Sequence, residues 1–411
     1  MRGEIIAIGN ELTSGRIVNT TSGFAAHHLF EAGFDIYAMH TIGDTPTLIG
    51  EALKRALGRV DFVLVTGGLG PTDDDLTTEA VSEALNRPTM PNLDLLYQIR
   101  SHLQAVSGPV VSPLEKLAWL PQGAETLTPN SKMSGFQLIH DDKPIFFLPG
   151  VPYQMQTLLI EQVLPRLADW YKDRLLTVFQ RVYKIFGKSE MEINKETKGL
   201  KLGEVVEIGY YPVFPDVHLS ITVRGSDPVA MQNIFTETCD IVEEKMNQFI
   251  YAKDEENMES VVGTLLQQQG QQLTVAESCT GGLISHLLTS VAGSSSYYLG
   301  GVVSYANSMK TSLLGVPDSL LQEYGAVSRE AAGAMAAGMR KRSAAHIALS
   351  VTGIAGPDGG SQEKPVGTVF VGIATGEAVQ THRFLFSGTR YEIQRLTAQT
   401  ALDLLRRYLL R

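Results

Sequence analysis

Short apolar runs separated by helical patterns constrain the fold of this chain more than any other sequence feature. Residues 4–8 (EIIAI) and 60–65 (VDFVLV) are mostly apolar, and segments with helical periodicity lie between them. A strand that is buried on both faces has this appearance, because helices cover both faces of a parallel sheet. The alternation of strands and helices therefore predicts a doubly wound α/β domain that extends to about residue 170.

The same alternation returns after a segment of different character. Residues 175–250 combine alternating strand patterns with helical segments, which is typical of a small α+β module. From about residue 257, helices again alternate with apolar runs such as 272–276 and 346–351. We therefore predict two doubly wound α/β domains joined by a small α+β module, with the boundaries 1–170, 171–252 and 253–411.

Composition argues against several classes of partner. The 411 residues include 34 basic and 44 acidic side chains, which gives a formal charge of −10. Nucleic acids and anionic membranes attract positive fields, so neither is an expected partner. No apolar stretch reaches the roughly 18 residues of a membrane-spanning helix, and residues 1–10 do not resemble a signal peptide. Cys239 and Cys279 provide no disulfide framework, so we expect a cytoplasmic protein.

Two glycine-containing turns follow predicted strands of the C-terminal domain. The turn 276–282 (AESCTGG) opens a helix, where free backbone N–H groups favour an anion or a developing oxyanion. The loop 353–360 contains four glycines, and its backbone suits close approach to a phosphate. The alternative for 276–282 is a tight turn that only permits close packing of a helix on the sheet, and neither turn decides the question by itself.

Serine, tyrosine and lysine side chains lie close together in the sequence that follows. Serines 294–296 precede Tyr305 and Lys310. A desolvated lysine with a lowered pKa could accept a serine proton, directly or through the tyrosine. On spacing alone, a serine loop with an unrelated tyrosine and a surface lysine is the better interpretation. Cys279 is a further candidate nucleophile, because a helix N-terminus lowers the pKa of a thiol.

A series of motifs in one order is more specific than these spacings. It consists of AESCTGG (276–282), AGSS (292–295), Tyr305 with Lys310, GAVS (325–328), TGIAGPDGG (352–360), KPVGTV (364–369) and FSGTR (386–390). Together these motifs closely resemble the nicotinamide-nucleotide amidohydrolase domain of the competence/damage-inducible CinA family. The resemblance implies hydrolysis of nicotinamide mononucleotide to nicotinate mononucleotide and ammonia, without a metal or an organic cofactor.

The resemblance also implies residue roles. Ser295 would be the nucleophile, with Tyr305 and Lys310 as the proton-handling pair, and Ser278 and Thr352 would lie at the amide and its oxyanion. The positions implied for substrate and phosphate binding are Gly281, Gly282, Gly353, Gly356, Gly359, Gly360 and Arg390.

Glycines beside carboxylates follow two strands of the N-terminal domain. Glu11 follows the first strand, and residues 67–77 (GGLGPTDDDLT) follow a later one. This pattern suggests a phosphate cradle with a divalent cation held by oxygen ligands. Alternatively, aspartates occur at a helix start simply because the helix dipole favours negative charge there. We favour this explanation for Asp73. The predicted site contains Glu11, Gly67, Gly68, Gly70, Asp74 and Asp75, with Asp74 and Asp75 as metal ligands.

These N-terminal motifs resemble the molybdopterin-binding domain that forms the first part of CinA proteins. The resemblance implies metal-dependent cleavage of ADP-ribose-type pyrophosphates. Two departures are Ser131, where a proline is common, and Gln154, which replaces an acidic residue. The middle module resembles the family's KH-like domain, but residues 187–190 (GKSE) lack the second glycine of an RNA-binding GxxG loop.

Alternatives to this bifunctional interpretation remain. The chain could be a non-catalytic nucleotide-binding protein linked to competence, or the N-terminal domain could perform molybdopterin-related nucleotidyl chemistry. The expected partners are small-molecule nucleotides, nicotinamide mononucleotide and ADP-ribose, and the resemblance implies a homodimer.

Overall fold

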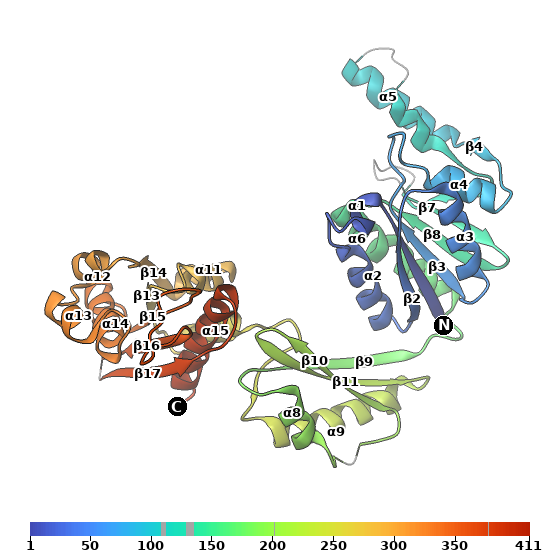
Figure 1. Ribbon diagram of the computed structural model, residues 1–411. Helices are drawn as coiled ribbons and strands as arrows, with labels where there is room; N and C mark the ends of the chain where they lie inside the picture. The colour runs from blue at the N-terminus through green and yellow to red at the C-terminus, as the bar shows by residue number, and fades with distance from the viewer. Residues whose placement is uncertain (108–111, 129–134, 201, 377) are drawn as a thin grey trace. The chain divides into compact units, whose positions relative to one another are not determined.

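Figure 1 shows a computed structural model of the chain, which describes residues 1–107, 112–128, 135–200, 202–376 and 378–411. Ser131 lies outside the described residues. The chain divides into two compact units. The first comprises residues 1–180, 203–206 and 222–236, and the second comprises residues 181–202, 207–221 and 237–411.

The first unit contains a six-stranded sheet in the order β2-β1-β3-β8-β7-β6. Strands β2, β1, β3 and β8 are parallel, whereas β7 and β6 continue the sheet antiparallel. Both predicted apolar runs are strands of this sheet. The bounds are β1 Arg2–Ile8, β2 Asp35–Ile42, β3 Phe62–Thr66, β6 Glu125–Thr126, β7 Phe136–His140 and β8 Lys143–Leu148; β4 Thr89–Pro91 and β5 Trp119–Pro121 form a separate pair.

Helices cover both faces of this sheet. Ile6 packs into one apolar cluster with helix residues such as Leu53, whereas Ile5 packs into another with Leu29 and Leu158. Adjacent strand residues point to opposite faces, so two separate clusters are the expected result of a doubly wound fold. The helices are α1 Asn10–Thr13, α2 Thr20–Glu31, α3 Pro46–Leu57, α4 Thr77–Ala84, α5 Leu93–Ser107, η1 Pro113–Ala118, α6 Pro152–Leu158, η2 Leu159–Val163 and α7 Leu164–Trp170.

The middle of the chain forms a four-stranded sheet in the order β10-β11-β9-β12, with two helices. Residues 187–190, the loop considered for RNA binding, lead into α8, whose start is capped by reciprocal hydrogen bonds between Ser189 and Glu192. The bounds are β9 Thr177–Ile185, α8 Glu190–Thr197, β10 Val206–Val213, β11 Asp216–Gly225, α9 Pro228–Met246 and β12 Ile250–Lys253.

The C-terminal part contains a five-stranded sheet in the order β14-β13-β15-β16-β17. Val275 packs with α10 and α15 on one face, and its neighbour Ala276 packs with α12 and α14 on the other. The strands are β13 Leu273–Glu277, β14 Tyr298–Val303, β15 Ile347–Gly353, β16 Thr368–Ala374 and β17 Val379–Leu385. The helices are α10 Met258–Gln268, α11 Leu283–Ser290, η3 Ser294–Ser296, α12 Asn307–Leu314, α13 Asp318–Tyr324, α14 Arg329–Ser343 and α15 Arg390–Leu409.

The predicted fold class is therefore confirmed. Because β13 is parallel to both β14 and β15, the carboxyl ends of these three strands meet at one edge of the sheet, with Glu277 opposite Val303 and Val351. Open α/β sheets bind ligands at such edges. Among the described residues, no helix combines the length and the apolar character needed to cross a membrane.

Candidate functional site

A pocket of about 260 Å³ lies at the carboxyl ends of β13 and β15. Its walls come from five parts of the chain: the turn after β13, the start of α12 with the residues before it, the segment between α13 and α14, the loop after β15 and the start of α15. The lining residues are Ser278, Cys279, Tyr305, Asn307, Lys310, Ala326, Val327, Thr352, Gly353, Ile354, Ala355, Gly356, Asp358, Gly359 and Arg390.

Lys310 is the only lysine of this lining, and its side chain is 1% exposed. Its Nζ donates hydrogen bonds to Ser278 Oγ at 3.1 Å and to the carbonyl oxygens of Ser304 and Tyr305 at 2.8 and 3.0 Å. All three acceptors are uncharged, and burial lowers the pKa of Lys310. A buried amine whose pKa is lowered, placed beside a serine hydroxyl, is an arrangement suited to a nucleophile and its general base.

Tyr305 and Arg390 connect this pair to the glycine-rich loop. Arg390 Nη2 donates to the Tyr305 hydroxyl at 3.1 Å, and Nη1 donates to the carbonyl oxygen of Gly356 at 2.8 Å. The Tyr305 hydroxyl therefore accepts from Arg390 and keeps its own hydrogen for another acceptor. Within the described residues, Lys310 Nζ contacts the carbonyl oxygen of Tyr305 rather than its hydroxyl, and the predicted proton-handling role of this tyrosine stays a prediction.

Ser295, the predicted nucleophile, lies in the short helix η3 and is exposed. It is not among the residues that line the pocket. The serine that meets Lys310 is Ser278, which the resemblance had placed at the amide instead. Sequence spacing favoured serines 294–296 as partners of Lys310 because they lie nearer to it in the chain. Ser278 reaches Lys310 only because the turn after β13 lies against α12. The role of Ser295 stays a prediction.

The predicted anion site at the start of α11 is occupied by the chain itself. The N–H groups of Gly282, Ile284 and Ser285 donate to the carboxylate of Glu277 at 2.8–3.1 Å. Gly281 and Gly282 both have positive φ angles, 63° and 102°, and neither lines the pocket. This geometry supports the tight-turn interpretation for these two glycines rather than phosphate binding.

Thr352 lines the pocket, but its hydroxyl hydrogen is already used. Its Oγ1 donates to the carbonyl oxygen of Ala326 at 2.7 Å. The N–H of Ser278 is likewise used, because it donates to the carbonyl oxygen of Val351 at 3.0 Å. The Thr352 hydroxyl and the Ser278 N–H are therefore not free to donate to an oxyanion. The Tyr305 hydroxyl is free to do so.

The loop after β15 offers free donors. In the described part of the chain, the N–H groups of Ala355, Gly356, Asp358 and Gly359 make no hydrogen bond to the protein, although these residues line the pocket. Successive free N–H groups beside a guanidinium, here that of Arg390, suit a phosphate. Of the predicted glycines here, Gly353, Gly356 and Gly359 line the pocket and Gly360 does not.

Cys279 is a poor nucleophile in this setting. It is 4% exposed, and burial raises the pKa of its thiol to about 12, which is opposite to the shift expected from a helix N-terminus. Its carbonyl oxygen accepts from Gln394 Nε2 at 2.7 Å, so this residue links the turn to α15.

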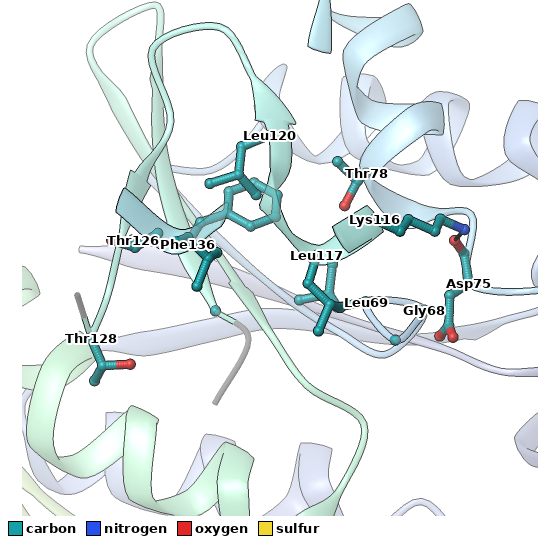
Figure 2. Close-up of a pocket in the computed structure, with 13 residues that line it drawn as sticks. Gly68, Leu69, Asp75, Thr78, Lys116, Leu117, Leu120, Thr126, Thr128 and Phe136 are labelled. Atoms are coloured by element: carbon teal, nitrogen blue, oxygen red, sulfur yellow. Dashed lines mark hydrogen bonds between the residues drawn. The ribbon is translucent and has the colours of Figure 1, made fainter. Parts of the chain in front are cut away.

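A second pocket lies in the N-terminal unit (Figure 2). Lys116 extends toward Asp75 at one end, and Leu69, Leu117, Leu120 and Phe136 form an apolar wall. Of the predicted residues, Gly68, Gly70 and Asp75 line this pocket, whereas Glu11, Gly67 and Asp74 do not. Gly67 instead meets a packing requirement, since a Cβ there would lie 2.1 Å from the carbonyl oxygen of Ile8.

Sequence reasoning missed Lys116, which lies in a segment without a recognisable motif. Its Nζ donates to the carbonyl oxygens of Asp75 and Thr72 at 2.6 and 3.0 Å, and it forms an ion pair of 3.4 Å with Glu79. One carboxylate oxygen of Asp75 accepts from the N–H and the hydroxyl of Thr72. A hydrogen bond from Thr72 is also the main cause that lowers the pKa of the exposed Asp74.

The predicted metal ligands were Asp74 and Asp75, and of these only Asp75 faces the pocket. Among the described residues, three metal-ligating side chains come together only at His27, His28 and Glu31 on α2, away from this loop. Magnesium is commonly held by one or two carboxylates together with substrate phosphates, so Asp75 fits such a site when substrate is bound.

Three protein-family models match the chain. "Probable molybdopterin binding domain" matches residues 4–169, "Damage-inducible protein CinA KH domain" matches 180–252, and "CinA C-terminal domain" matches 255–409. A CinA-like protein of Desulfotalea psychrophila is 56% identical over 99% of this chain and 98% of its own length. A putative competence-damage inducible protein of Caldicellulosiruptor bescii is 38% identical over 99% of both chains. The crystal structure of a competence/damage inducible protein from Agrobacterium tumefaciens is 42% identical over 38% of this chain and 94% of that chain, with a TM-score of 0.37.

Proposed function

Since this chain belongs to the CinA family, we propose that its C-terminal domain hydrolyses the amide of nicotinamide mononucleotide to nicotinate mononucleotide and ammonia. The observation that carries the proposal is the buried pair of Ser278 and Lys310, which shares one pocket with the free N–H groups of Ala355, Gly356, Asp358 and Gly359. A site that only bound phosphate would not require a buried amine beside a serine hydroxyl.

The reaction follows from the positions of these groups. The free amine of Lys310 accepts the proton of Ser278 Oγ, and Oγ attacks the carbonyl carbon of the amide. The Tyr305 hydroxyl donates to the oxyanion that forms. Lys310 returns the proton to the leaving nitrogen, so ammonia departs and an acyl ester remains on Ser278. Water, deprotonated by Lys310, then hydrolyses this ester, and the serine regains its proton.

The glycine-rich loop and Arg390 explain why the substrate would be a nucleotide. The free N–H groups of Ala355, Gly356, Asp358 and Gly359 and the guanidinium of Arg390 present positive charge to a phosphate. A phosphate held there fixes the substrate, so that the amide at its other end is presented to Ser278 in a constant geometry.

Ammonia release from nicotinamide mononucleotide by the purified full-length chain tests this proposal, with and without a chelator. We expect release that the chelator does not affect and that Ser278→Ala abolishes. A folded protein that binds the nucleotide without releasing ammonia would contradict the proposal and favour a non-catalytic nucleotide-binding protein.

A second activity is proposed for the N-terminal pocket, where Gly68, Gly70, Asp75 and Lys116 lie together. We propose cleavage of an ADP-ribose-type pyrophosphate there with a divalent cation. Asp75 and the substrate phosphates would hold the cation, which would stabilise negative charge on the pyrophosphate. Lys116 contributes a further positive charge. Molybdopterin-related nucleotidyl chemistry would use the same groups, so assays with both substrate classes separate the two.

A further inference from the structure

Glu277 is the last residue of β13, directly before Ser278, and its side chain is fully buried. It does not line the pocket. Its carboxylate accepts five hydrogen bonds from the turn that follows. Oε2 accepts from Thr280 Oγ1 at 2.6 Å, Gly282 N at 3.0 Å and Ile284 N at 3.1 Å, and Oε1 accepts from Ser285 N at 2.8 Å and Ser285 Oγ at 2.6 Å.

These bonds organise a turn that is otherwise weakly determined. Gly281 and Gly282 both occupy the left-handed region, and a Cβ at either position would meet no atom within 3.4 Å apart from those of the adjacent residues. Their conformation is therefore not imposed by close packing. A buried carboxylate is tolerated only when its acceptor capacity is filled, and hydrogen bonds to a charged acceptor are the stronger kind. The five donors and the carboxylate therefore hold one another in place.

A second contact extends the network to β14. The Tyr298 hydroxyl donates to Ser285 Oγ at 2.7 Å, so the Ser285 hydroxyl accepts from the tyrosine and donates to Glu277. The main chain of Glu277 also takes part, because its carbonyl oxygen accepts from Ser304 N at 2.8 Å. The carbonyl of Ser304 is in turn one of the groups that hold the amine of Lys310.

We propose that Glu277 is the positioning residue of this site. Its carboxylate holds the 278–285 turn so that Ser278 Oγ stays within hydrogen-bond distance of Lys310 Nζ. This inference rests on the proposed amidohydrolase function. It also explains why substrate phosphate is held at the loop after β15 rather than at α11, whose N–H groups already bind this carboxylate.

Glu277→Gln tests the proposal, with steady-state kinetics as the first readout. The amide nitrogen of glutamine cannot accept, so at least two of the five donors lose their acceptor. We expect kcat for ammonia release to fall by about tenfold to a hundredfold, because small displacements of a nucleophile have effects of that size. KM should change by less than about threefold, since residues 355–359 and Arg390 keep their contacts.

Two further variants keep the test decisive. Ser285→Ala removes one of the five donors, the Ser285 hydroxyl, together with its hydrogen bond from Tyr298. It should also lower kcat, by a smaller factor than Glu277→Gln. Asn257→Ala is the control, because Asn257 caps α10 in the same domain without lining the pocket. This control should lose stability without a change in kcat. Folded Glu277→Gln or Ser285→Ala protein with the kcat of the wild type would overturn the proposal.

Hydrogen–deuterium exchange provides a readout that does not depend on activity. We expect the amides of residues 278–285 to exchange faster in Glu277→Gln than in the wild type or in Asn257→Ala. Unchanged exchange in this segment would contradict the role of Glu277 even if the enzyme is active. A wild-type protein that releases no ammonia would remove the proposed function, and the exchange result would still show whether Glu277 holds the turn.

Discussion

Ser278 and Lys310 are separated by 32 residues in the chain, and their side chains meet in a hydrogen bond of 3.1 Å. The lysine is held there by two carbonyl oxygens of the segment between β14 and α12, and the serine by a turn anchored on Glu277. Both partners therefore lie on rigid supports, as a nucleophile and its base require.

The two candidate nucleophiles give opposite expectations. Ser278→Ala should reduce kcat for ammonia release by at least about 10³-fold, because the attacking atom is lost. Ser295→Ala should remain within about threefold of the wild type, because Ser295 is exposed and does not line the pocket. Parallel kinetics of the two variants measure this. An inactive Ser295→Ala beside an active Ser278→Ala would assign the nucleophile to Ser295.

The pH dependence of the reaction should report Lys310. Burial lowers the pKa of this lysine, and only its uncharged form accepts a proton from Ser278. The rate should therefore rise with pH, with a midpoint below the ordinary lysine value of about 10.4. Lys310→Arg should be inactive at every pH, since arginine stays protonated. The control is Lys364→Arg, which lies outside the pocket; a pH-independent rate would argue against Lys310 as the base.

Arg390 should act on substrate affinity. Arg390→Ala removes the guanidinium beside the loop after β15, and we expect KM for nicotinamide mononucleotide to rise by about ten- to a hundredfold. The same substrate without its phosphate should bind equally weakly to wild type and variant. Kinetics with both compounds measure the difference. If Arg390→Ala raised KM equally for the compounds with and without phosphate, Arg390 would not be the residue that binds the phosphate.

Asp216 should make stability depend on pH. Its carboxylate accepts from the Tyr251 hydroxyl at 2.7 Å and from Gln399 Nε2 at 3.0 Å, and burial raises its pKa to about 6. The folded state thus binds this proton more tightly than the unfolded state, and the resulting stabilisation is lost as pH rises from about 4 to about 6.

Asp216→Asn cannot ionise, so it should gain stability relative to the wild type over the same interval, on the order of 2 kcal/mol. Denaturant unfolding at several pH values measures this, with Asp173→Asn as an exposed control. Parallel pH profiles for wild type and Asp216→Asn would contradict the expectation.

A substitution in one pocket should abolish one proposed activity and leave the other unchanged. Asp75→Asn should abolish pyrophosphate cleavage in the N-terminal pocket and leave ammonia release unchanged, because Asp75 lies in the other pocket. A chelator should have the same selective effect. Assays of both products on one preparation measure this. Pyrophosphate cleavage that survives Asp75→Asn with unchanged metal dependence would exclude Asp75 as the cation ligand.

The apolar runs at 4–8 and 60–65 and the glycine-containing turns after strands were sufficient to predict the fold class. Strand burial and turn geometry depend on neighbouring residues, so a local pattern carries this information. The order of the C-terminal motifs predicted the family for the same reason, since each motif occupies a few consecutive residues.

The sequence did not predict which side chains contact one another in the folded chain. The motif 276–282 contains Ser278, but only the packing of α12 against the end of β13 brings Lys310 to it rather than to Ser295. Lys116 reaches the N-terminal loop from a segment 41 residues away. Such pairings follow from how strands and helices pack in space, and separation along the chain contains little of that information.

The sequence by itself determined which turns carry functional groups, because backbone conformation at glycines and strand ends is local. Only the tertiary structure decided which of those groups are available to a ligand. Glu277 accepts from N–H groups at the start of α11, and the carbonyl of Ala326 accepts from the hydroxyl of Thr352, whereas the N–H groups of Ala355, Gly356, Asp358 and Gly359 stay free. The physical reason is that a donor is available only if the folded chain leaves it without an acceptor.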